Sequence, residues 1–179
     1  MSQVVSEDAL DYEEILRRGG RNFGDEDFAL FKCPGCERVY MMEYEVDTVY
    51  LDALDLSKRI GVDGSFECLG CGVLIPQDRP WVGPNAAAEF QVSWAQLARS
   101  NWTWAVRLLL KPEDVEIAIA RVGGGQDALI VMHKPTGIRR SKGPPQAWKF
   151  KHEMLREIQA ELLERGLTQY IRLTDTDNS

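Results

Sequence analysis

The four cysteines of the chain occur in two motifs with the same spacing. Two residues separate Cys33 from Cys36, and two residues separate Cys68 from Cys71. In a Cys-x-x-Cys turn both thiolates can point at one ion, and two such turns supply the four ligands of a tetrahedral site. Because scattered cysteines would rarely pair in this way, the pattern predicts that these four residues bind one metal ion. Reduced cysteines buried in a core are the alternative.

The residues before the first motif indicate whether the cysteines are reduced or form disulfides. Ser2–Asp11 is acidic and polar, unlike the cationic and apolar segment of a secretory signal. We therefore expect a cytoplasmic protein with reduced cysteines rather than two disulfides. No stretch approaches the roughly 18 uninterrupted apolar residues of a membrane span, so no membrane partner is expected.

Strand-forming residues surround both motifs. Phe28–Phe31 precedes the first motif, Val39–Met42 follows it, and Val73–Ile75 follows the second. This predicts two hairpins with a cysteine turn, here called a knuckle, at each tip. A closed four-sulfur site leaves no coordination position for water or substrate, which indicates a structural ion rather than a catalytic one.

Residues 28–80, with both knuckles, resemble the zinc-ribbon and rubredoxin-like superfamily. The resemblance implies a four-cysteine site for Zn²⁺, or for iron that transfers single electrons, and we expect Zn²⁺ with Fe as the alternative. The chain has Glu37 where the first knuckle of that superfamily normally has glycine. It is also expected to lack the cluster of core aromatics that this superfamily has between the knuckles, with Phe66 and Tyr50 as the only partial substitutes.

The remainder of the chain is expected to form an amino-terminal helix and a carboxy-terminal β-β-β-α unit. Ser6 could cap a helix over residues 7–18, and Ser93-x-x-Gln96 is the pattern of a capping box that opens a short helix. The predicted segments are an N-terminal helix at 1–20, a four-cysteine zinc ribbon at 21–80, a tryptophan-rich connection at 81–111, a β-β-β-α unit at 112–173 and a flexible tail at 174–179.

The fold class predicted from these elements is α+β. Apolar and polar residues alternate over 115–120, and further strands are expected at 129–133 and 138–141. A helix follows, with Met154, Ile158 and other apolar residues on one face. The tryptophans of the connecting segment are expected in the core, with base stacking as the alternative; they are Trp81, Trp94, Trp102 and Trp104.

The two halves of the chain differ in charge. Residues 1–80 contain 17 acidic and 8 basic residues, whereas residues 81–179 contain 11 acidic and 13 basic ones. Six Lys and Arg residues with interleaved aromatics and no acidic residue lie within 128–152, which is a pattern suited to phosphate contact and base stacking. The predicted binding face consists of Lys134, Arg139, Arg140, Lys142, Trp148, Lys149 and Lys151.

The net charge of −7 shows that the chain as a whole is not a polyanion binder. The basic face is therefore expected to bind RNA, DNA or an acidic protein partner locally. The alternative is a solvated face whose charges compensate the acidic half of the same molecule.

Gly124-Gly125-Gln126, followed by 133–138 with the sequence His-Lys-Pro-Thr-Gly-Ile, is similar to the catalytic module of class I peptide-chain release factors. The resemblance implies hydrolysis of peptidyl-tRNA, with Gln126 at the catalytic centre. Only 127–132 lies between the two motifs here, in place of the sizeable basic segment of that family. A glycine-rich hairpin turn explains the first motif without chemistry.

The function expected from the sequence is binding rather than catalysis. A structural zinc site with four cysteine ligands is predicted to shape the amino-terminal half, and the basic face is predicted to contact the partner. An iron electron carrier is the first alternative, and a release-factor-like hydrolase is the second. The sequence leaves the oligomeric state open.

Overall fold

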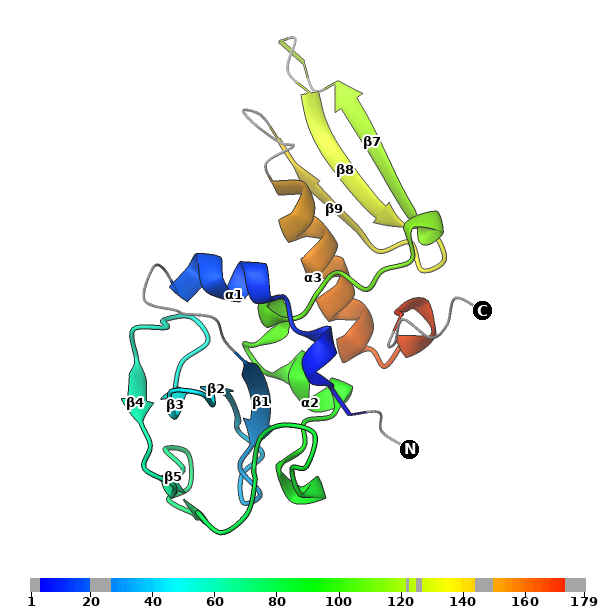
Figure 1. Cartoon of the computed structure of the whole chain (residues 1–179). Helices are drawn as coiled ribbons and strands as arrows, with labels where there is room; N and C mark the ends of the chain where they lie inside the picture. Colours follow the sequence, from blue (N-terminus) through cyan, green and yellow to red (C-terminus); the bar gives the residue numbers. More distant parts are fainter. Residues whose placement is uncertain (1–3, 20–26, 122, 125–126, 144–149, 173–179) are drawn as a thin grey trace. The chain divides into compact units, whose positions relative to one another are not determined.

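The computed structural model describes residues 4–19, 27–121, 123–124, 127–143 and 150–172. The chain divides into two compact units, Met1–Arg107 and Leu108–Ser179. The described residues form three small antiparallel sheets and three α-helices, which confirms the α+β class (Figure 1). The segment boundaries predicted from the sequence stay predictions.

The first unit contains a four-stranded sheet and a separate hairpin. The sheet has the order β1-β2-β3-β4, with strands Phe28–Lys32, Val39–Glu43, Thr48–Tyr50 and Arg59–Gly61. The hairpin pairs β5 (Phe66–Glu67) with β6 (Leu74–Ile75). The first knuckle joins β1 to β2 and the second joins β5 to β6, so each knuckle is the tip of a hairpin, as expected.

An aromatic cluster packs between the two hairpins. Phe31, Tyr40, Phe66 and Trp81 are all buried. The ring centroids of Phe31 and Trp81 lie 4.5 Å apart, and those of Tyr40 and Phe66 lie 5.0 Å apart. The cluster belongs to the same core as the first cysteine of each knuckle.

Tyr50 does not share this cluster, although it is fully buried. It lies opposite Met41 in the β2–β3 register, whereas Tyr40 and Met42 point to the other face of β2. Its hydroxyl donates a hydrogen bond of 2.8 Å to Glu43. The expected lack of an aromatic cluster is therefore wrong, because Phe31, Tyr40 and Trp81 pack with Phe66. Tyr50 is no substitute in it, because strand alternation places its side chain on the opposite face of the sheet.

The amino-terminal helix is divided in two. A 3₁₀ turn covers Glu7–Ala9, and α1 runs from Tyr12 to Gly19. Between them Leu10 forms an antiparallel bridge to Val106, which holds the backbone extended. The side chain of Ser6 caps nothing; instead Asp11 Oδ1 accepts a hydrogen bond of 3.0 Å from the Glu14 amide.

The capping box and the buried tryptophans are confirmed. Helix α2 (Trp94–Arg99) begins with reciprocal hydrogen bonds between Ser93 and Gln96. The indole N–H of Trp102 donates to the Val39 carbonyl, and all four tryptophans of the connecting segment are buried. Their burial supports a core role, because a base-stacking ring must be open to solvent.

The second unit has the predicted β-β-β-α order. Strands β7 (Val115–Arg121), β8 (Asp127–His133) and β9 (Arg139–Lys142) form an antiparallel sheet, and α3 spans Lys151–Glu164. Helix α3 packs on β8 and β9. Leu129, Val131 and His133 of β8 are buried and face α3, whereas Ile130 and Met132 on the other face are only half-buried.

The turn between β8 and β9 repeats the backbone of the knuckles without their thiols. The His133 amide donates to the Ile138 carbonyl, and the Gly137 amide donates to the His133 carbonyl, both at 2.8 Å. His133 and Thr136 take the positions of the two cysteines, and His133 Nδ1 lies 2.8 Å from Thr136 Oγ1. His133 is fully buried, and no described group forms a hydrogen bond with its Nε2 atom.

We expect the second unit to lose stability in acid because of His133. Burial lowers its pKa, against an opposing effect of Asp114, so the unfolded chain takes up the proton more readily than the folded one. The contribution of His133 is complete above the unfolded pKa of about 6.5 and is lost as the pH falls towards the folded pKa. Amide hydrogen exchange of residues 127–142 between about pH 7 and pH 5 measures this loss. The variant His133→Phe should reduce the pH dependence of this exchange. The variant His152→Phe, at an exposed position, should leave it unchanged. The same pH dependence in both variants would contradict the role of His133.

Candidate metal centre

The two knuckles have the same hydrogen-bonded backbone. In the first, the Cys33 amide donates to the Arg38 carbonyl and the Glu37 amide donates to the Cys33 carbonyl, both at 2.9 Å. In the second, the Cys68 amide donates to the Val73 carbonyl at 2.9 Å, and the Gly72 amide donates to the Cys68 carbonyl at 2.8 Å. Two copies of one turn therefore face each other from two hairpins that are distant in sequence.

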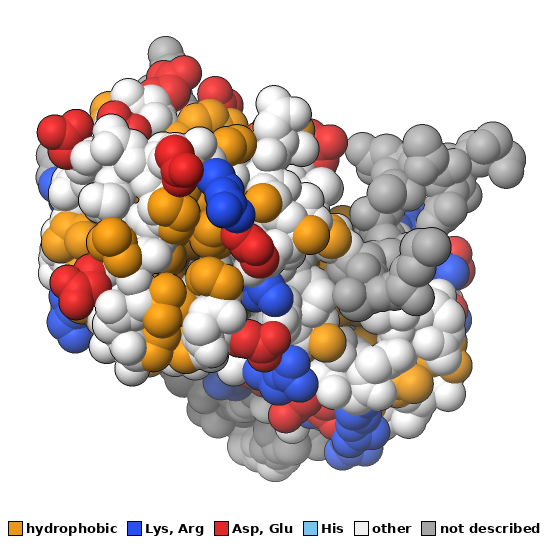
Figure 2. Space-filling model, turned by 90° about the horizontal axis from the view of Figure 1, so that it is seen from below, with side chains coloured by type: hydrophobic (Ala, Val, Ile, Leu, Met, Phe, Trp, Pro, Cys, Tyr) orange, Lys and Arg blue, Asp and Glu red, His pale blue; other side chains and the backbone are white. Residues whose placement is uncertain are grey.

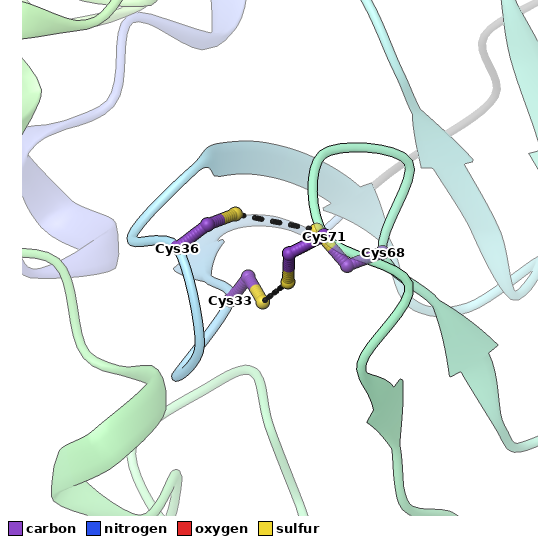
Figure 3. Close-up of side chains that lie close together, drawn as sticks. All are labelled: Cys33, Cys36, Cys68 and Cys71. Carbon is purple, nitrogen blue, oxygen red and sulfur yellow. Dashed lines mark hydrogen bonds between the residues drawn. The ribbon is translucent and has the colours of Figure 1, made fainter.

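The four sulfur atoms lie together between the knuckles (Figure 3). All four Sγ atoms are within 4.8 Å of one another. Two pairs of sulfurs, one from each knuckle, lie 3.5 Å apart: Cys33 with Cys71, and Cys36 with Cys68. A disulfide requires about 2.05 Å. A tetrahedron of sulfurs about 2.3 Å from a central ion has edges of about 3.8 Å, so this arrangement fits a four-thiolate metal site.

Hydrogen-bond donors surround the first cysteine of each knuckle. The amides of Gly35 and Gly70 donate to the sulfurs of Cys33 and Cys68, each at 3.3 Å. The buried hydroxyl of Tyr40 lies 3.3 Å from the Cys68 sulfur and accepts a hydrogen bond from the Leu69 amide. Burial raises the pKa of Tyr40, so its proton remains available to the sulfur. Such donors stabilise the negative charge of a metal-bound thiolate.

The thiols differ in their tendency to ionise. Burial raises the pKa of Cys33 to about 12 and also raises the pKa of Cys36. Burial acts in the same direction on Cys68, but hydrogen bonds from Tyr40 and the knuckle amides outweigh it and lower the pKa to about 6. Four thiolates this close repel one another, so a cation is needed to hold all four ionised, and its binding releases protons.

The third residue of each knuckle is glycine because the opposite knuckle comes very close. A Cβ atom on Gly35 would lie 2.9 Å from Val73 Cγ2 and 3.1 Å from the Cys71 sulfur. A Cβ atom on Gly70 would lie 3.0 Å from the Cys36 sulfur. Neither glycine has a positive φ. Space for the facing sulfur, rather than a tight backbone turn, therefore accounts for both residues.

The position after each second cysteine has the left-handed backbone. Gly72 has φ of 75°, and Glu37 takes the same position in the first knuckle with φ of 62°. A side chain in this region costs about 1 kcal/mol or more. Glu37 Oε1 accepts a hydrogen bond of 3.0 Å from Gln96 Nε2 and lies 3.8 Å from Lys32 Nζ. These contacts hold the Glu37 side chain at the position that glycine occupies in the second knuckle.

Strand alternation divides the basic face predicted from the sequence. Arg140 and Lys142 point to the α3 side of β9, where Arg140 is 3.1 Å from Glu157 and 2.6 Å from Glu161. Lys142 lies 3.8 Å from Glu153. Arg139 lies opposite Met132 on the other face of the sheet.

The remaining residues of the predicted face lie on other elements or outside the described residues. Lys134 is exposed in the β8–β9 turn and Lys151 begins α3, whereas Trp148 and Lys149 lie outside the described residues. On the face drawn in Figure 2, Lys and Arg side chains lie among Asp and Glu side chains. Binding of nucleic acid or an acidic partner stays a prediction. The carboxylates of α3 that pair with β9 lie after residue 152, so a search within 128–152 missed them.

The glycine-rich motif lies in the connection between β7 and β8. Gly123 and Gly124 both have positive φ, which glycine adopts readily. Gly125 and Gln126 lie outside the described residues, so the resemblance to a release-factor loop stays a prediction.

Tyr40 is a contributor to the site that the sequence analysis did not identify. Its position in a strand, four residues after Cys36, is the one feature of the sequence that could have indicated this role. Only the facing hairpin shows that its hydroxyl reaches the Cys68 sulfur.

No helix in the described ranges is long and apolar enough to cross a membrane. Comparison with models of protein families, with curated proteins and with solved structures finds no match for the chain.

We expect Gly70→Ala to weaken metal binding about tenfold or more, because the new methyl group would displace the Cys36 sulfur. Gly61→Ala is the matched control, since a Cβ atom at Gly61 meets nothing within 4 Å. Competition against a chelating dye measures both affinities. Equal affinities for the two variants would refute the steric explanation.

Tyr40→Phe should lower metal affinity about tenfold, because it removes the hydroxyl beside Cys68 and leaves the Leu69 amide without that acceptor. Tyr50→Phe is the control, since this equally buried hydroxyl bonds Glu43 instead of a sulfur. Both variants should lose about 1–3 kcal/mol of stability on unfolding in denaturant. Only Tyr40→Phe should change the affinity measured with the dye, and a matching change in Tyr50→Phe would contradict the role of Tyr40.

Proposed function

We propose that Cys33, Cys36, Cys68 and Cys71 bind one Zn²⁺ ion and that this ion has a structural role, in a zinc-ribbon unit that spans about residues 28–80. The observation that carries the proposal is the convergence of four sulfurs within 4.8 Å from two turns of identical backbone. Four protein thiolates complete a tetrahedral shell, so the site offers no open position for substrate.

The small size of the hairpins supports a structural role. Strands β5 and β6 contain two residues each, and an isolated two-stranded hairpin is marginally stable at best in water. The sulfurs of Cys33 and Cys68 belong to the buried core, beside Phe31 and Phe66. An ion at this point would join the two hairpins directly beneath their aromatic contact.

Iron in the same sulfur cage would make the unit an electron carrier instead. Thiolates suit both metals, and a closed shell of four cysteines is the usual form of a structural zinc site. Elemental analysis of the purified chain decides between them. Absence of visible absorption together with one zinc per chain supports the proposal, whereas a coloured protein with one iron per chain supports the alternative.

Removal of the metal should unfold the knuckle region and spare the second unit. Structural zinc in small domains contributes free energy on the order of 10 kcal/mol to folding. Hydrogen exchange of the full chain should therefore show loss of protection in β1, β2, β5 and β6 after treatment with a strong chelator. Cys36→Ser should reproduce this loss.

Strands β8 and β9 and helix α3 are the internal control for this experiment. Their protection should persist after chelation, because their core contains no ligand of the ion. Unchanged protection of the knuckle region in a chain shown to be free of metal would reject the structural role.

A further inference from the structure

Strand β7 is an open edge of the three-stranded sheet in the second unit. It pairs with β8 along all seven of its residues, and within the described part of the chain no strand pairs with its other side (Figure 1). Five of the seven residues are exposed. The outer edge therefore presents backbone donors and acceptors to which another strand can add.

Two apolar side chains of β7 on the α3 side of the sheet are exposed to solvent. Ile117 and Ile119 are 37% and 54% exposed. They lie opposite Val131 and Leu129 in the register, and both of these β8 residues are fully buried beneath α3. The apolar layer of the sheet thus continues past the helix to the open edge and ends there exposed.

The edge lacks the features that normally prevent pairing. Edge strands are protected by proline, lysine, bulges or short length, whereas β7 is seven residues long and contains only two charged residues, Glu116 and Arg121. Asp114 precedes the strand, so its start is acidic and its end is basic. An antiparallel partner of the same sequence would place opposite charges together at both ends, and a parallel one would place like charges together.

We propose that β7 of one chain pairs antiparallel with β7 of a second copy and forms a continuous six-stranded sheet. In the register that pairs all seven residues, Val115 lies opposite Arg121, Ile117 lies opposite Ile119, and Ala118 lies opposite its own counterpart on a two-fold axis. The four isoleucines then share the α3 side of the sheet, because opposed residues in an antiparallel pair point to the same face. A register shifted by one residue would separate them onto opposite faces.

This interface closes on itself and does not depend on the metal site. The same edge serves both copies, so the contact is isologous and ends at a dimer. Arg121 of each copy lies opposite Val115 of the other strand, on the α3 side of the sheet. The neighbouring acidic group on that side is Asp114, whose carboxylate lies 4.0 Å from the buried His133, whereas Glu116 points to the other face. The reciprocal match of Arg121 with Asp114 favours a second copy over a peptide of unrelated sequence.

Sedimentation of the full, metal-loaded chain over a concentration series tests the proposal. We expect a species of twice the 20.3 kDa chain mass and at least about a tenfold rise in its dissociation constant in Ile119→Lys, because an edge lysine opposes pairing. Leu54→Lys is the matched control, since Leu54 is 76% exposed but lies in the first unit. A chain that stays monomeric throughout, or a dimer that both substitutions weaken equally, overturns the proposal.

Disulfide cross-linking tests the register. Ala118→Cys should form a covalent dimer under mild oxidation, because the two introduced thiols meet at the axis. Ala120→Cys should not, because its counterparts are four residues apart along the strand, about 14 Å, beyond the reach of a disulfide. The parent chain, oxidised under the same conditions, measures the cross-linking that its own four cysteines produce. Stronger cross-linking of Ala120→Cys than of Ala118→Cys overturns the register.

Discussion

Four sulfur atoms within 4.8 Å of one another impose the main constraint on the first unit. Ionised thiolates at this separation repel one another. The sulfurs of Cys33 and Cys68 lie in the buried core beside aromatic rings, whereas Cys36 and Cys71 are exposed. Other local features follow from keeping the sulfurs there. Glycine at Gly35 and Gly70 leaves room for the facing knuckle, and backbone amides donate hydrogen bonds to the sulfurs, with the Tyr40 hydroxyl beside Cys68. All of these features are compatible with one cation between the four sulfurs.

The same turn serves two purposes in this chain. The knuckles and the β8–β9 turn share one hydrogen-bond pattern, and each has a positive φ at its fifth position. In the knuckles the first and fourth side chains are thiols that converge with a second copy of the turn. In the β8–β9 turn those positions hold His133 and Thr136, which bond each other and close the turn on itself. The backbone geometry is therefore common to all three turns, and the side chains decide whether a turn can bind metal.

Short-range patterns predicted most of the elements correctly. Spacing alone was sufficient for the two knuckles, the Ser93 capping box, and the strands and helix of the second unit, because each depends on residues a few positions apart. Distant segments add contacts that local patterns do not reveal. The bridge from Leu10 to Val106 divides the expected amino-terminal helix. The carboxylates of Glu157 and Glu161 in α3 pair with Arg140 of the predicted basic face, whose binding role stays a prediction.

The amino-acid sequence by itself was enough to identify the four candidate ligands and the fold class, because cysteine spacing and hydrophobic periodicity are local properties of the chain. Only the tertiary structure decided which sulfurs face each other, why Gly35 and Gly70 must lack a side chain, and that Tyr40 rather than Tyr50 reaches the cluster. It also decided that the apolar layer of the second unit ends uncovered at β7. These features depend on strand register and on the approach of distant hairpins, and a shift of one residue in register would reverse the face of every side chain concerned.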